Sequence, residues 1–146
     1  MIRNDKEYQE ALRRLATDQD FIARQRAALE QMGLAPEEVE RGVGPTLSFH
    51  AQLVDEVEWY ERVCRRDFEV IRTLTAIGRL LIAARIANGV SQRELAERLS
   101  VSEAQVSRDE RNEYQGVTVE RAQRILECLG ETVTARIEDR PLARVG

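Results

Sequence analysis

Hydrogen-bonding side chains are concentrated on one short segment of the sequence, residues 102–110, which reads SEAQVSRDE. An arginine such as Arg108 can donate two parallel hydrogen bonds to a guanine or contact a phosphate, and a glutamine such as Gln105 can pair with adenine. Glu103 could accept a hydrogen bond from cytosine, but a carboxylate is repelled by phosphates and is better suited to stabilising a helix N-terminus. These residue types suit recognition of nucleic acid better than they suit catalysis.

Few residues in the sequence have the type and spacing that a catalytic or metal site requires. His50 is the only histidine, and the carboxylate clusters at residues 37–40 and 55–58 have no histidine or cysteine at metal-ligand spacing. Cys64 and Cys128 fall in helical patterns and are interpreted as small hydrophobic residues. No glycine-rich phosphate loop is present. We therefore expect no enzymatic activity, no cofactor and no metal site.

Two short helices joined by a tight turn are predicted to position the segment 102–110. Ser91 suits a helix N-cap, and Glu94 stands at the position that completes a capping box. Ser102 repeats the pattern with Gln105, and Val106 supplies the apolar anchor of the second helix. The first helix has one apolar face, formed by Leu95, Ala96 and Leu99. This pattern predicts a helix-turn-helix.

The segment resembles the helix-turn-helix of the Xre family, the lambda-Cro and phage-repressor type. The residues that carry the likeness are Gln92, Glu94-Leu95-Ala96, Val101-Ser102, Val106-Ser107-Arg108 and Glu110. The likeness extends over about residues 74–130, because helical patterns before and after the motif also fit. The resemblance implies a helical DNA-binding domain with double-stranded DNA as its partner.

The resemblance also implies an ion pair between Arg85, near the end of the preceding helix, and Glu110, which closes the second helix of the motif. We expect this pair to be partly buried and to fix the second helix in place. The sequence departs from the family at Asp109, where a large apolar residue is usual.

The second helix of such a motif enters the major groove, while the first helix crosses the DNA backbone. Arg108 is the strongest candidate for reading a base, with a phosphate contact as the alternative. Gln105 is equally suited to reading adenine and to capping its own helix, and Ala104 could contact a thymine methyl group. The groove-facing candidates are Ser102, Glu103, Ala104, Gln105, Ser107 and Arg108.

Residues flanking the second helix are candidates for holding the DNA backbone. The resemblance places Gln92 where the family uses a glutamine to bond a phosphate at the start of the first helix, and backbone N–H groups there also favour an anion. For each of these residues alone, a solvated surface position is the plain alternative. The backbone-contacting candidates are Gln92, Arg93, Arg111, Asn112 and Tyr114.

The net charge of −4 is unevenly distributed along the 146 residues. Residues 1–71 carry 10 basic and 15 acidic groups, whereas residues 72–136 carry 10 and 9. The acidity therefore lies away from the motif, and binding to DNA requires only a local basic surface. No secretory signal is evident, and the longest near-apolar run, residues 80–84, is too short for a bilayer. We expect a cytoplasmic, nucleoid-associated protein without membrane contact.

The N-terminal half is predicted to form a helical hairpin. One helix should run from about residue 5 to residue 32 and a short one over 36–41, followed by a loop at 42–45 and a second long helix over 47–66. Its stripe of apolar side chains is expected to meet a second copy of the chain, with packing on the C-terminal domain as the alternative. The predicted dimerisation residues are Tyr8, Leu12, Leu15, Phe49, Leu53, Val57 and Tyr60.

The predicted fold class is all-α. Further helices are expected at residues 75–88, 92–99, 103–111 and 119–129, and residues 68–73 and 132–137 could pair as a small two-stranded ribbon. The chain then divides into an N-terminal dimerisation hairpin (1–67), an Xre-like domain (68–138) and a loose tail (139–146).

These features predict a homodimeric repressor that binds a palindromic operator through residues 103–111. A rival interpretation rests on residues 114–118 and the helix after them, which are similar to HigA-type antitoxins. In that case the N-terminal half would bind a toxin partner. A third possibility is a protein-interaction module whose motif no longer binds DNA, suggested by the acidic total together with Glu103 and Asp109.

Overall fold

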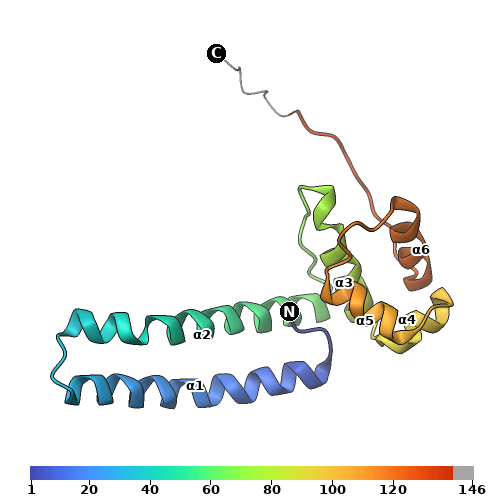
Figure 1. Cartoon of the computed structure of the whole chain (residues 1–146). Helices are drawn as coiled ribbons and strands as arrows, with labels where there is room; N and C mark the ends of the chain where they lie inside the picture. Colours follow the sequence, from blue (N-terminus) through green and yellow to red (C-terminus); the bar gives the residue numbers. More distant parts are fainter. Residues whose placement is uncertain (140–146) are drawn as a thin grey trace.

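A computed structural model describes residues 1–139 of the chain, and within that range every regular element is helical. Two long helices, α1 (Asp5–Gln31) and α2 (Pro36–Cys64), form an antiparallel hairpin with a compact helical bundle at one end (Figure 1). The bundle consists of a 3-10 turn η1 (Leu74–Ala76), α3 (Ile77–Ala87), α4 (Gln92–Leu99), α5 (Glu103–Arg111) and α6 (Val119–Leu129). None of the helices described is both long enough and apolar enough to cross a membrane. The all-α prediction is confirmed.

α2 is one continuous helix, which corrects the prediction of a short helix over 36–41, a loop at 42–45 and a new helix over 47–66. Pro45 lies inside the helix, where it has no N–H to donate to the preceding turn. Packing on α1 compensates for this loss. Val43 is completely buried, and Gly42 lies so close to α1 that a Cβ there would be 2.7 Å from Cδ1 of Leu29. The glycine and proline pattern therefore marks close approach between helices and not a loop.

The apolar stripe predicted to meet a second copy lies mostly inside the hairpin. The rings of Tyr8 and Tyr60 stack with centroids 5.0 Å apart, and the Tyr8 hydroxyl donates to Oε1 of Glu61 at 2.7 Å. Tyr60 and Val57 are buried, and the partly buried members that pack on the same core are Tyr8, Leu12, Leu15 and Leu53. Only Phe49 stays largely exposed, at 65%. The dimer seam assigned to these residues is thus used within one chain, because α1 and α2 already cover each other's stripes.

The base of the hairpin and the bundle share one hydrophobic core. Trp59 and Val63 of α2 belong to the same buried cluster as Leu81 and Ile82 of α3, and Ile2 inserts into it with 3% exposure. The core therefore crosses the boundary predicted at residue 67.

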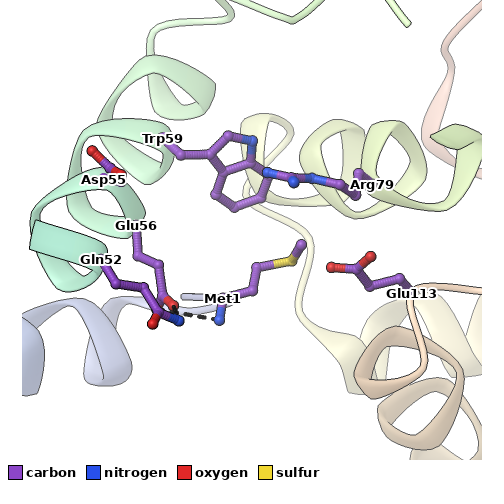
Figure 2. Close-up of a pocket in the computed structure, with 7 residues that line it drawn as sticks. All are labelled: Met1, Gln52, Asp55, Glu56, Trp59, Arg79 and Glu113. Carbon is purple, nitrogen blue, oxygen red and sulfur yellow. Dashed lines mark hydrogen bonds and ion pairs between the residues drawn. The ribbon is translucent and has the colours of Figure 1, made fainter. Parts of the chain in front are cut away.

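A shallow hollow of about 360 Å³ lies beside this joint (Figure 2). The guanidinium of Arg79 lies over the Trp59 ring, 5.7 Å from its centroid, and the Met1 amino group pairs with Oε2 of Glu56 at 3.2 Å. The remaining lining residues are Gln52, Asp55 and Glu113. The contact of Arg79 with Trp59 joins α3 of the bundle to α2 of the hairpin beside this hollow.

The predicted ribbon is absent from the part of the chain that the structure describes. Residues 68–71 and 131–139 have no regular secondary structure, and no backbone ladder joins them. Ile137 is fully exposed, and the described residues after Glu131 extend away from the bundle (Figure 1). The alternation at 132–137 therefore has no buried face to define a strand. All but the first residue of the predicted tail, 139–146, lies outside the described residues.

Gly78 allows the turn between α5 and α6 to pack directly on α3. A Cβ at this position would lie 1.8 Å from the carbonyl oxygen of Glu113 and 3.1 Å from Cβ of Tyr114. Both of these turn residues have a positive φ of 51°, so the backbone here has little freedom to move away.

We expect Gly78→Ala to lower the free energy of unfolding by about 1–3 kcal/mol or more, the usual cost of overpacking a core. Urea denaturation measures this change. Gly44→Ala is the matched control, because Gly44 lies in α2 with nothing near its missing Cβ. That change should stabilise the protein by about 1 kcal/mol through helix propensity. Equal effects of the two substitutions would contradict the close packing at Gly78.

Candidate nucleic-acid interface

The two helices of the motif begin at the predicted caps. The Ser91 hydroxyl accepts from the Glu94 N–H at 3.0 Å, and Oε2 of Glu94 accepts from the Ser91 N–H at 2.8 Å, which completes the capping box of α4. Ser100 ends α4 in a left-handed conformation, and the Ser102 hydroxyl then caps α5 by accepting from the Gln105 N–H at 3.1 Å. These local hydrogen bonds define a tight turn between α4 and α5.

One side of α5 is fixed in the bundle, and the other side is left free. Val106 is completely buried, and it belongs to the same core as the apolar face of α4, formed by Leu95, Ala96 and Leu99. Glu110, one turn further along the same side, is also buried. The orientation of α5 is therefore set by its buried side.

Arg85 and Glu110 form a buried ion pair, with 3% and 1% exposure. Nη2 of Arg85 donates to Oε2 of Glu110 at 2.8 Å, and Nε donates to Oε1. The same guanidinium donates from Nη1 to the Val90 carbonyl at 2.8 Å and from Nη2 to the Arg3 carbonyl at 3.0 Å. One cation thus joins α3, α5, the turn before α4 and the segment that precedes α1.

The Gln92 side chain is turned towards this ion pair. Its Nε2 donates to Oε2 of Glu110 at 2.6 Å, and the residue is half-buried. The phosphate contact predicted for Gln92 therefore requires its amide to share or release the Glu110 carboxylate.

The structure brings most of the predicted groove-facing residues together on the free side of α5. Ser102, Glu103, Ala104 and Arg108 are exposed, whereas Gln105 and Ser107 are half-buried. Arg111 and Asn112, at the end of the helix, are exposed as well. Arg93 on α4 is exposed and pairs with Glu97 at 3.3 Å.

A chain of side-chain contacts runs along α5 and onto α6. Nη2 of Arg108 donates to Oε1 of Gln105 at 2.9 Å, and Nε2 of Gln105 donates to Oδ1 of Asp109 at 2.9 Å. Nη2 of Arg121 on α6 then donates to Oδ2 of Asp109 at 2.6 Å. The Gln105 side chain therefore does not complete a capping box with Ser102, which was one of its two predicted roles.

The sequence prediction missed Arg121. Asp109 stands where an apolar residue is usual, and an acidic residue in a half-buried position needs a cation or hydrogen-bond donors. That requirement was the available signal, but nothing in the sequence identified which arginine would supply the contact.

Tyr114 corrects the predicted list of backbone-contacting residues. It is only 5% exposed, and from its place in the α5–α6 turn it packs against Gly78 of α3. Burial, followed by the nearby carboxylates of Glu110 and Asp109, raises the pKa of its phenol. Tyr114 is a core residue and is not available to phosphates.

Comparison with known protein families agrees with this geometry. The helix-turn-helix family model matches residues 81–135, a range from within α3 to beyond α6. This part of the chain is therefore similar to the helix-turn-helix family. The match supports a DNA-binding transcription regulator, as the sequence predicted. No curated protein and no solved structure matches the chain.

The buried ion pair of this domain should respond strongly to removal of one partner. We expect Glu110→Ala to lower the free energy of unfolding by about 3–5 kcal/mol, because Arg85 is left charged and desolvated. The double variant Arg85→Met/Glu110→Leu should lose less than the single variant, since it removes both charges and keeps apolar volume. Urea denaturation of the three proteins measures the difference, and a double variant less stable than Glu110→Ala would contradict this account.

The capping box should give the domain a stability that depends on acid. The N–H of Ser91, and then its hydroxyl, hold the pKa of Glu94 below its usual range. A carboxylate with a lowered folded-state pKa stabilises the protein above its unfolded pKa, and this contribution is lost as the pH falls through the folded value.

Thermal melts between about pH 5 and pH 3 should therefore show a smaller loss of Tm for Glu94→Gln than for the wild type. Glu97→Gln is the control, because Glu97 lies on the same helix and is exposed. Its profile should follow the wild type, and a Glu94→Gln profile parallel to both would contradict the role of the cap.

Proposed function

We propose that this protein is a sequence-specific DNA-binding transcription regulator that places α5 in the major groove. The observation that carries the proposal is the division of α5 into two sides. Val106 and Glu110 hold one side in the bundle, while Arg108 and the first turn project from the other. This is the arrangement in which a recognition helix presents its N-terminal side chains to base edges.

Arg108 is assigned the main base contact in this proposal. Its guanidinium lies towards the N-terminal end of α5 because it donates to Gln105, and an arginine there can bond guanine through two hydrogen bonds. Gln105, held from behind by Asp109, is the second candidate and suits adenine. Ala104 and Ser107 are small enough to allow the backbone of α5 to approach the base pairs.

Contacts to the DNA backbone are assigned to the ends of the motif. Arg93, near the start of α4, and Arg111 and Asn112, at the end of α5, are exposed on either side of the groove-facing residues. Such contacts set the register of the protein on the duplex without reading sequence. The N–H groups at the start of α4 favour a phosphate in addition.

We further propose a homodimer that represses by covering a promoter. A two-fold dimer would match a palindromic operator with half-sites about 34 Å apart, one turn of DNA. The role requires binding alone, and we assign no catalytic step to the chain.

The test is a gel-shift series on an operator selected from random DNA. Arg108→Ala should lose about 1–3 kcal/mol of preference for the operator over random DNA, roughly a 5- to 150-fold change, because a base contact is removed. Arg93→Ala is the comparison variant. It should weaken binding to both DNAs alike and reduce the salt dependence by about one phosphate contact. An Arg108→Ala protein with full discrimination would overturn the assignment of the base-reading residue.

A further inference from the structure

Two exposed phenylalanines lie level with each other on the hairpin, far from the motif. Phe21 on α1 is 54% exposed and Phe49 on α2 is 65% exposed. The contacts between the two helices show that the rings lie at the same height along the hairpin. Asp18 faces His50 on one side of the two rings, and Gln25 faces Thr46 on the other. Neither ring contributes to the core of the monomer.

Each phenylalanine is the centre of a row of three residues spaced by seven, the spacing that returns to the same side of a helix after two turns. The α1 row is Arg14, Phe21 and Ala28, and the α2 row is Gly42, Phe49 and Glu56. Because the helices are antiparallel, Arg14 lies level with Glu56 and Ala28 lies level with Gly42.

Both rows lie on the same side of the hairpin. Phe21 and Ala28 flank Gln25 on one side of α1, at positions four residues before it and three after it. Gln25 reaches across to the Gly42 carbonyl and to Thr46, which the α2 row flanks in the same way. The opposite side is closed by the ion pair between Arg26 and Glu40. We call the side that carries the two rows the Phe21/Phe49 face.

We propose that the Phe21/Phe49 face is the dimer interface, and that it packs on the same face of a second copy about a two-fold axis parallel to the hairpin. This inference rests on the proposed homodimer and assigns its surface. In this arrangement α1 of each copy lies on α2 of the other, so each residue of one row meets the residue level with it in the other row.

The chemistry of the rows favours this partner and this axis. Phe21 meets Phe49 of the second copy, and Arg14 meets Glu56. Near the tip Ala28 meets the exposed backbone of Gly42, whose missing Cβ points at Leu29 of its own chain, and the small size of both residues allows a short distance between the helices. An axis perpendicular to the helices would instead place Arg14 opposite Ala28 and leave both charges without a partner on the second copy.

Arg14 and Glu56 can make these contacts alongside those within their own chain. The Arg14 side chain is 66% exposed, and its nearest carboxylate, on Asp18, is 4.0 Å away. The Glu56 side chain is 29% exposed; its Oε2 pairs with the Met1 amino group, and its Oε1 accepts a long hydrogen bond of 3.4 Å from Nε2 of Gln52, which Arg14 of the second copy would share or displace. The parallel axis also places both helix-turn-helix domains at the same end of the dimer, as a two-fold operator requires.

Sedimentation equilibrium of the full chain at 1–100 μM tests the interface. The wild type should be a dimer, whereas Phe21→Glu/Phe49→Glu and Phe21→Lys/Phe49→Lys should each be monomeric because like charges face each other. An equimolar mixture of the two variants should return to a dimer. The substituted positions are exposed, so thermal melts should show that all of these chains remain folded.

Leu47→Glu is the matched control. Leu47 is an exposed apolar residue seven positions after Glu40, so it lies on the opposite side of the hairpin. This variant should dimerise like the wild type. A monomeric wild type at 100 μM, a dimer that survives the Glu/Glu substitution, or a Leu47→Glu protein that is monomeric would each overturn the assigned face.

A distance measurement tests the axis. A spin label at Gln31→Cys, in a chain with Cys64→Ser and Cys128→Ser, marks the tip of the hairpin. The parallel axis places the two tips together, whereas the perpendicular axis, which passes at the level of Phe21, separates them by about 30 Å, twice the rise of the ten residues from Phe21 to Gln31. Pulsed electron paramagnetic resonance should give the short distance, and a value of about 30 Å would overturn the parallel axis. A failed interface would leave the Arg108 experiment unaffected, because a single motif can still discriminate its half-site.

Discussion

The position of α5 depends on one buried guanidinium. Arg85 is desolvated, and Glu110 and the carbonyls of Val90 and Arg3 supply acceptors for it from three other parts of the chain. A buried charge allows little tolerance in the placement of its partners, since each unmade hydrogen bond costs the full desolvation of the group. The ion pair therefore sets the geometry of the motif more tightly than the apolar contact at Val106 could alone.

This constraint also connects the motif to the hairpin. The Arg3 carbonyl belongs to the segment before α1, and Ile2 beside it lies in the shared core with Trp59 of α2. Gly78 brings the α5–α6 turn onto α3 at the same joint. The hairpin and the bundle therefore behave as one packed body, and a hairpin-mediated dimer would fix the spacing of two recognition helices.

Local hydrogen bonding explains which parts of the fold could be predicted from the sequence. Three helices of the bundle, α4, α5 and α6, follow from their caps at Ser91, Ser102 and Thr118, whose hydroxyls accept from N–H groups three residues away. The continuity of α2 through Pro45 depends instead on packing against α1, which no local signal contains. The prediction of a ribbon is wrong for the converse reason. Alternation at residues 132–137 predicts a strand only where a partner strand exists.

The site shows the same division. The free side of α5 was predictable because Val106 identified the buried side. The burial of Tyr114 was not predictable, because it follows from the close approach of Gly78 and two residues with positive φ. The pairing of Asp109 with Arg121 likewise joins residues on different helices, and the sequence showed only that Asp109 departs from the usual apolar residue.

That pairing has a consequence for how the motif can change over evolution. Arg121 restrains Asp109, Asp109 restrains Gln105, and Gln105 holds the guanidinium of Arg108. A substitution on α6 can thus alter the rotamers presented by α5 without touching the surface itself. Binding preference in this protein can drift through a position that lies outside α5.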